Sequence, residues 1–140
     1  MIPKENPPLT NVELEFMQIL WNMETATPED IRHAFHDSGR ILTGGSVRKM
    51  LLILMDKGWI SRMEKGRGYT YFPLIGRDQA RRSMLHDLIL KAFGGSPAVM
   101  IASLMGSSRI SQEEISQMEQ IITQYRKERD DVSSDSDASD

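Results

Sequence analysis

Basic side chains are concentrated in the middle of this 140-residue chain. Residues 40–82 hold ten basic residues and three acidic ones, an excess of +7, although the whole chain carries −3. The ten are Arg40, Arg48, Lys49, Lys57, Arg62, Lys65, Arg67, Arg77, Arg81 and Arg82. An excess of this size favours a surface that binds a polyanion such as nucleic acid. From charge alone, a solvated face is an equally good interpretation.

Residue patterns that support catalysis or metal binding are missing from the sequence. It contains neither GxSxG nor HExxH, and the absence of cysteine excludes thiolate metal sites, disulfides and cysteine nucleophiles. His33 and His36 are three residues apart, but two ligands do not complete a structural metal site, so we interpret them as surface residues. We therefore predict no enzymatic activity, no metal and no cofactor.

The apolar content of 39% is enough for a modest core in one domain, or in a small domain with an appendage. The longest apolar run is the six residues from Met50 to Met55, which is too short for a membrane span. The first eight residues contain no apolar segment of a secretory signal. We expect a cytoplasmic protein without membrane insertion.

Three helices are predicted in the first half of the chain. Thr10 and Thr27 are N-cap residues of the first two helices, and Thr43 or Ser46 begins the third. The expected ranges are 10–23, 27–39 and 43–58. Small and basic residues face outward near the start of the third helix, together with Leu52, while Val47, Met50, Leu51 and Leu54 face inward.

A β-hairpin is predicted next, with strands at 59–64 and 69–73 and two turn glycines, Gly66 and Gly68. Three helices followed by a hairpin is the order of a winged helix-turn-helix, in which one helix enters the major groove of DNA and the hairpin lies on the flanking backbone. The residues that we expect to face bases are Gly45, Ser46, Arg48 and Lys49. Those expected on the DNA backbone are Thr10, Thr27, Thr43, Arg62, Lys65, Arg67 and Tyr69.

The last third of the chain is predicted to be helical over 77–93, 97–105 and 111–129. Apolar residues at spacings of three and four on the last helix favour a coiled-coil-like contact with a second copy. The candidate dimer residues are Leu88, Val99, Ile101, Leu104, Ile115, Met118, Ile122 and Tyr125. Residues 130–140 hold five Asp and no basic residue, which is typical of a disordered acidic tail.

The predicted fold class is therefore mostly α with a small β-hairpin. We expect a flexible arm over 1–8, a winged helix over 9–75, a helical dimerisation module over 76–129 and the acidic tail. A winged helix that only contacts protein, and a regulator that senses a ligand in a pocket between the two modules, remain alternative hypotheses.

Four stretches resemble the penicillinase-repressor family (BlaI, MecI and CopY repressors). They are LTNVELEFMQILW (9–21), SVRKMLLILMDKGWI (46–60), GRGYTYFPL (66–74) and the helix stop Phe93-Gly94-Gly95. The resemblance implies a homodimeric repressor whose winged helix binds an inverted repeat in double-stranded DNA and whose C-terminal helices dimerise.

Some residues depart from the pattern of that family. Gly45 and Lys49 differ from its usual residues, which implies an operator different from the family's TACA/TGTA-type half-site. The lack of cysteine excludes the thiolate copper sensing of one branch. In the β-lactam branch a cleaved Asn-Phe bond, the implied target of a membrane-bound sensor protease, aligns here with Ser103-Leu104. The resemblance therefore implies release by proteolysis at this bond or by another signal on the C-terminal helices.

Overall fold

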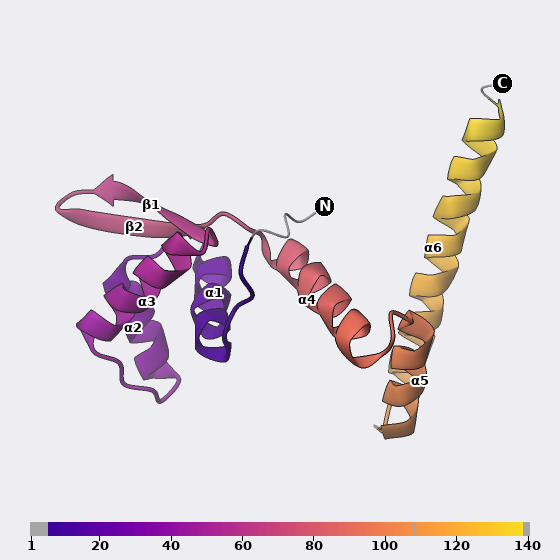
Figure 1. Ribbon diagram of the computed structural model, residues 1–140, viewed down its shortest axis with the longest axis horizontal. Coiled ribbons are helices and arrows are strands. Elements are labelled where there is room, and N and C mark those ends of the chain that lie inside the picture. Colours follow the sequence, from indigo (N-terminus) through magenta and orange to yellow (C-terminus); the bar gives the residue numbers. More distant parts are fainter. Residues whose placement is uncertain (1–5, 108, 139–140) are drawn as a thin grey trace. The chain divides into compact units, whose positions relative to one another are not determined.

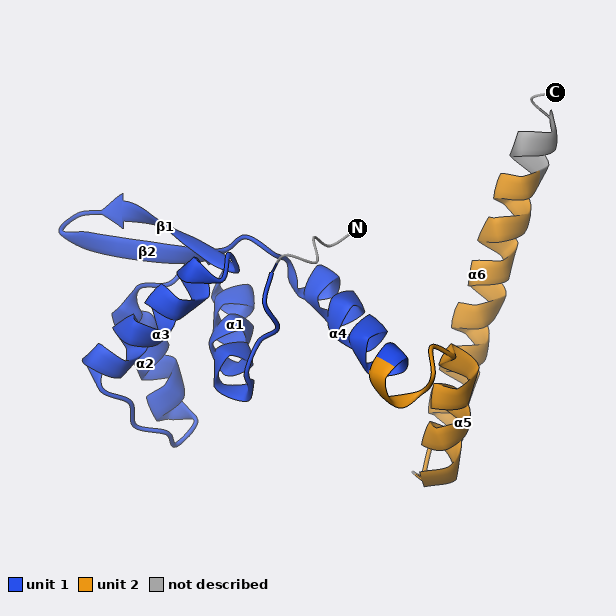
Figure 2. Ribbon diagram, in the orientation of Figure 1, with its two compact units in different colours: residues 1–90 blue, residues 91–140 orange. Residues whose placement is uncertain are grey.

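The computed structural model describes residues 6–107 and 109–138 and falls into two compact units, residues 1–90 and 91–140 (Figures 1 and 2). The boundary lies fifteen residues later than the one expected after residue 75. The reason is that the chain after the hairpin still packs into the first unit, where Ile75 and Ala80 are buried. Leu88, a candidate dimer residue, consequently belongs to the first unit.

The first unit contains three helices, a hairpin and most of a fourth helix. The elements are α1 (Asn11–Met23), α2 (Pro28–Asp37), α3 (Gly44–Asp56), β1 (Ile60–Lys65), β2 (Gly68–Pro73) and α4 (Arg77–Ala92). Thr10, Thr27 and Thr43 are the N-caps of the first three helices, as predicted. Each threonine side chain accepts a hydrogen bond from the backbone N–H three residues later, which satisfies one free donor of the helix start.

The core of this unit lies between α1, α2 and α3. The largest fully buried side chains are Phe16, Met17, Leu20, Ile31, Val47, Leu51, Leu54 and Ile60. The rings of Phe16 and Phe35 pack with their centroids 4.9 Å apart. Because three helices contribute to one closed core, the outward face of α3 is held on a rigid support.

The hairpin is a two-stranded antiparallel sheet in which Lys65 pairs with Gly68 and Arg62 pairs with Tyr71. Gly66 has φ 63°, the sign that the first central position of a type II′ turn requires. Gly68 has no positive φ, so only one of the two turn glycines is needed for its conformation. Tyr71 also exchanges two backbone hydrogen bonds with Ala26, at 2.8 and 3.0 Å, which fastens the hairpin to the segment before α2.

The arm that was expected to be flexible is bound to the end of α3 over the part that the structure describes. Asn6 Nδ2 donates to the carbonyl of Lys57 at 3.0 Å, and Trp59 Nε1 donates to the carbonyl of Pro7 at 2.8 Å. These bonds satisfy polar groups where α3 ends, so the prediction of a free arm is wrong for residues 6–8. Residues 1–5 lie outside the described residues.

The second unit contains α5 (Pro97–Ser107) and α6 (Gln112–Ala138). Ser96 and Ser111 cap these helices, with Oγ accepting from the N–H of Val99 at 3.2 Å and of Glu114 at 3.1 Å. Helix α6 continues past Arg129, where it was expected to end, because neither glycine nor proline interrupts the chain after residue 106. The acidic tail is therefore helical up to Ala138 rather than disordered, and residues 139–140 lie outside the described residues.

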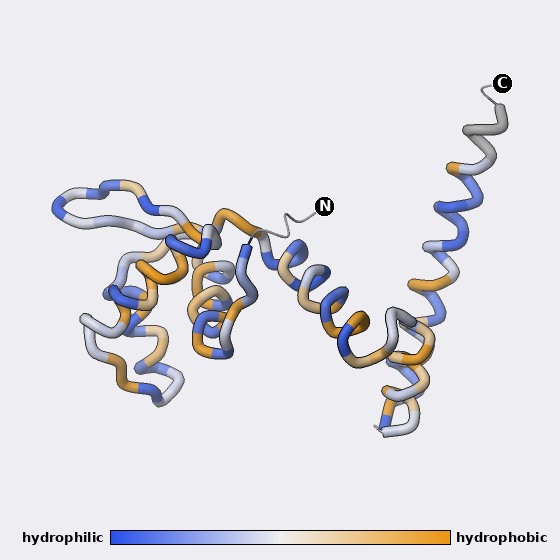
Figure 3. The backbone as a smooth tube through the Cα atoms, in the orientation of Figure 1, coloured by the Kyte–Doolittle hydropathy of each residue, from blue (hydrophilic) through white to orange (hydrophobic). Residues whose placement is uncertain are grey.

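Apolar side chains of the second unit remain exposed in the single chain. None of the residues of α5 is buried, although this helix is apolar along most of its length. Figure 3 shows the contrast with α6, which becomes mostly hydrophilic toward its end. No single helix among the described residues is long and apolar enough to cross a membrane, and only α4 and α5 taken together reach the length and composition of a span.

Candidate nucleic-acid interface

The start of α3 is held by hydroxyl groups. Thr43 Oγ1 accepts from the N–H of Ser46 at 3.1 Å and lies 2.9 Å from Ser46 Oγ, to which it donates. Both residues are exposed, as is Gly45 between them. The first turn therefore presents small polar groups and backbone, with no bulky side chain that would keep a ligand away.

Basic side chains occupy the next turn of the same outward face. Arg48 and Lys49 are exposed, while Val47 and Leu51 on the opposite face are fully buried. The guanidinium of Arg48 lies along the first turn, since a Cβ atom on Gly44 would be 3.7 Å from both Nη atoms. This direction follows from the tilt of helical Cα–Cβ bonds toward the N-terminus. The structure thus brings together Gly45, Ser46, Arg48 and Lys49, the four residues predicted to face bases.

The hairpin carries a second basic group. Lys65 and Arg67 are exposed at its tip, which Figure 3 shows as hydrophilic. Among the described residues, neither these two side chains nor Arg48 and Lys49 form an ion pair. Four positive charges on α3 and the hairpin are therefore not neutralised by any side chain that the structure describes.

Arg62 is held against the hairpin by two tyrosines. Its guanidinium carbon lies 3.9 Å from the ring centroid of Tyr69, and Nη1 donates to the hydroxyl of Tyr71 at 3.4 Å. The hydrogen bond to Tyr71 raises the pKa of Arg62 further above its usual value. Arg62 and Tyr69 were predicted to contact the DNA backbone, but the sequence did not indicate that they stack on each other. The stacking holds a positive charge at the middle of the hairpin.

Three other basic residues of the 40–82 segment have partners inside the first unit. Lys57 Nζ lies 2.7 Å from Oε1 of the buried Glu13, Arg40 pairs with Glu15, and Arg77 donates to Asn22 Oδ1. Burial acts to raise the pKa of Glu13, but the hydrogen bonds from Lys57 and Thr10 and the charge of Lys57 outweigh it, and the pKa is lowered. Part of the predicted basic surface is thus structural.

Of the three helix starts predicted to contact the DNA backbone, Thr43 begins α3 itself, and the other two lie in different places. Thr27 follows Ala26, which is hydrogen-bonded to Tyr71, so the start of α2 is next to the hairpin. The backbone N–H of Thr10 donates to the carboxylate of Glu13, the partner of Lys57, so Thr10 lies beside the C-terminal end of α3. Because α3 rises about 18 Å from Gly45 to Lys57, Thr10 is not grouped with the residues of the first turn.

Among the described residues, no three His, Asp or Glu side chains are close enough together to hold a metal ion. His33 lies 3.4 Å from Glu29 in an exposed i,i+4 pair. The basic face is therefore the main chemical feature of the first unit.

The family model described as "Penicillinase repressor" matches residues 9–124, most of the chain. The chain belongs to the penicillinase-repressor family. The penicillinase repressor of Bacillus licheniformis is 21% identical over 126 residues, covering 90% of this chain and 98% of that protein. The methicillin resistance regulatory protein MecI of Mammaliicoccus sciuri is 21% identical over 114 residues, covering 81% and 92%.

The chain has a fold similar to that of a solved structure with a TM-score above 0.5. The complex structure of hsRosR-S4 has a TM-score of 0.52 at 15% identity and covers 87% of this chain and 93% of that one. The solution structure of the DNA-binding domain of the repressor BlaI has a TM-score of 0.48 at 24% identity, covering 54% and 92%. The predicted fold class and family are confirmed, and this member of the penicillinase-repressor family is a DNA-binding transcriptional repressor.

Proposed function

We propose that this repressor binds an inverted-repeat operator as a homodimer, with α3 of each protomer in the major groove. The observation that carries the proposal is a group of four basic side chains on α3 and the hairpin tip that form no ion pair with residues the structure describes: Arg48, Lys49, Lys65 and Arg67. Polyanion binding uses such charges, whereas a structural role uses paired ones, as in Lys57–Glu13.

The two groups of charges have different tasks in this proposal. The first turns of α3 carry Ser46, Arg48 and Lys49 to the edges of bases, where arginine and lysine donate to guanine O6 and N7. Lys65 and Arg67 reach phosphates beside the groove, with Arg62 and Tyr69 supporting the hairpin. Thr27 and Thr43 add helix starts that offer backbone N–H groups to phosphate oxygens.

Selection of bound duplexes from a random pool tests the proposal with the full-length protein. We expect two inverted half-sites whose centres are about 10 base pairs, or a multiple, apart. Binding to the selected duplex should weaken steeply with salt, because each neutralised phosphate releases counterions. Failure to enrich any sequence, together with a flat salt dependence, would favour the alternative of a winged helix that contacts only protein.

The homodimer is supported by apolar side chains that the single chain leaves uncovered. Ile115 and Met118 on α6 are half-buried, whereas Ile122 and Tyr125 on the same stripe are 53% and 60% exposed. On α5, Val99, Ile101 and Leu104 are also exposed. A symmetric second copy that covers these residues would remove this surface from water.

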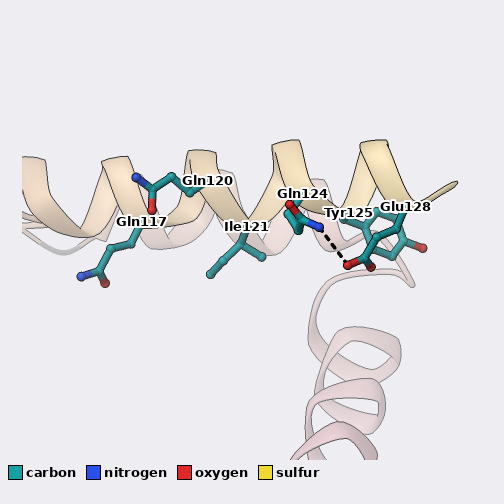
Figure 4. Close-up of a pocket in the computed structure, with 6 residues that line it drawn as sticks. All are labelled: Gln117, Gln120, Ile121, Gln124, Tyr125 and Glu128. Atoms are coloured by element: carbon teal, nitrogen blue, oxygen red, sulfur yellow. Dashed lines mark hydrogen bonds between the residues drawn. The ribbon is translucent and has the colours of Figure 1, made fainter. Parts of the chain in front are cut away.

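A substitution on that stripe tests the dimer. Ile122→Asp places a charge where a partner should pack, so we expect the mass in solution to fall from two chains to one at micromolar concentration. Figure 4 shows Gln117 on a groove of α6 that also includes Ile121 and Tyr125. Ser116 is exposed on the same helix and does not line this groove, so Ser116→Asp is the matched control and should stay dimeric. A monomeric wild-type protein would contradict the homodimer.

We also propose that the inducing signal acts on the second unit. In the single chain Ser103 and Leu104 are exposed residues of α5, and a helix without buried side chains opens at low cost, as a protease requires. Because the proposed second copy covers Leu104, cleavage requires that the two C-terminal modules first separate. A membrane-bound sensor protease is the partner that this proposal implies. Cleavage between these two residues after induction, detected by mass spectrometry of the repressor, would support it. An intact repressor that has left its operator would point to another signal.

A further inference from the structure

Leu52 is an apolar side chain on the face of α3 that carries the unpaired cations. It is 54% exposed, whereas Leu51 and Leu54 beside it are fully buried. It is not among the partly buried side chains that pack against the core within the described residues. Leu52 therefore contributes little to the packing of the core of the first unit. A ligand bound to this face of α3 would contact its side chain.

Helical spacing aligns Leu52 with the basic residues. It follows Arg48 by four positions and Lys49 by three, so the three side chains share one face of α3. Four residues correspond to about 6 Å along the helix axis. Because base pairs are about 3.4 Å apart, the proposed docking of α3 in the major groove would put Leu52 one or two base pairs further along than Arg48.

The major groove presents one apolar group, the C5-methyl of thymine, and otherwise hydrogen-bond donors and acceptors. A leucine can neither donate nor accept, so the thymine methyl is the base feature that it can recognise. We propose that Leu52 determines specificity by contacting a thymine methyl one or two base pairs from the base that Arg48 contacts. This inference rests on the proposed function, in which α3 lies in the major groove.

Deoxyuridine substitution tests this contact, because it removes the methyl group and leaves the hydrogen-bonding edge unchanged. Each thymine of the selected operator is replaced in turn, and the affinity of the full-length protein is measured. We expect one symmetric position at which the loss is about fourfold for one half-site and on the order of tenfold for both, as for a buried methyl group.

Two alanine variants assign the effect to Leu52. Leu52→Ala should bind the unmodified operator about as weakly as the wild type binds the uracil duplex, and should lose no further affinity on that duplex. Leu74→Ala is the matched control, since Leu74 is 57% exposed in the same unit and lies outside α3. This variant should retain the wild-type response to uracil. The wild-type scan gives its own answer if either variant fails to fold.

Specific outcomes would overturn the inference while leaving the proposed function intact. One is a selected operator without thymine within two base pairs of the base whose identity matters to Arg48. Another is equal sensitivity to uracil in the wild type and Leu52→Ala. Failure to select any operator would instead remove the proposed function, and this inference with it.

Discussion

The two units use their apolar residues in opposite ways. The first unit closes a core within one chain, where Phe16, Leu51 and Leu54 are fully buried. The second unit buries no residue of α5 and leaves much of the stripe on α6 in water. The first unit therefore completes its core within a single chain, whereas the C-terminal helices leave apolar side chains in water that the proposed second copy would cover.

The largest expected effect on stability comes from replacing one leucine of each unit by alanine. Leu51→Ala should lower the free energy of unfolding of the first unit by about 2–5 kcal/mol, because it leaves a cavity in a closed core. Leu104→Ala, at a position that is 41% exposed in the single chain, should act on association instead. Denaturant unfolding at several protein concentrations separates them, since only an effect on association depends on concentration. A concentration-independent loss of similar size for Leu104→Ala would show that α5 packs within its own chain.

The helix starts are the features that could be predicted best from the sequence. Each of these starts depends on an N-cap hydrogen bond between residues three positions apart, which a short stretch of sequence is enough to indicate. The N-cap residues are Thr10, Thr27 and Ser111. The predicted end of α6 at Arg129 was wrong because the acidic composition of the following residues was interpreted as disorder. The segment contains no glycine or proline that would end the helix. The chain divides into its two units after Leu90 and not after residue 75, because the packing of Ala80 depends on tertiary contacts that the sequence does not indicate.

The sequence could predict which residues of the candidate site share one helix face. It could not predict which basic residues form ion pairs with distant parts of the chain. Helical spacing alone grouped Gly45, Arg48 and Lys49. The ion pair of Lys57 with Glu13 joins residues 44 positions apart, and no local pattern indicates it. Charge counting therefore overestimated the free basic surface, since Lys57 was included in the predicted excess.

The ion pair of Glu13 and Lys57 provides a second test of the closed first unit. Lys57→Ala leaves a buried carboxylate without its cation, so we expect a loss of about 1.5–3 kcal/mol in the free energy of unfolding at pH 7. Arg40→Ala breaks a pair whose side chains are both more than 40% exposed and is the matched control, with an expected loss below about 1 kcal/mol.

The pH dependence of this pair follows from the lowered pKa of Glu13. A carboxyl with a depressed pKa in the folded state stabilises the fold above its unfolded pKa, and this contribution is lost as the pH falls through the folded value. The difference between the wild type and Lys57→Ala should therefore shrink when unfolding is measured at decreasing pH below 4.5, the ordinary value for Glu. A difference that stays constant down to pH 3 would mean that Glu13 does not titrate with this pair.

Substitutions with a smaller effect distinguish residues of the first unit that contact bases from residues that contact phosphates. Arg48→Ala should lower affinity for the operator by about 1–3 kcal/mol per half-site and leave affinity for a scrambled duplex nearly unchanged. Lys65→Ala and Arg67→Ala should weaken both duplexes similarly and reduce the salt slope by about one unit for each lost phosphate contact. All variants are measured on both duplexes across a salt series. Equal losses on both duplexes for Arg48→Ala would show that α3 does not read bases through this residue.

The smallest expected effect concerns the acidic end of α6. Truncation after Arg129 removes five Asp and no basic residue, which leaves a chain with a net charge of +2 instead of −3. Lower repulsion from DNA should raise operator affinity by no more than about threefold at low salt, and the gain should vanish near 0.15 M salt, where the Debye length is about 8 Å. Replacement of the same Asp residues by Asn in the full-length chain is the control, because it removes the charge and keeps the length. A gain on truncation that Asn does not reproduce would assign the effect to the extended helix rather than to its charge.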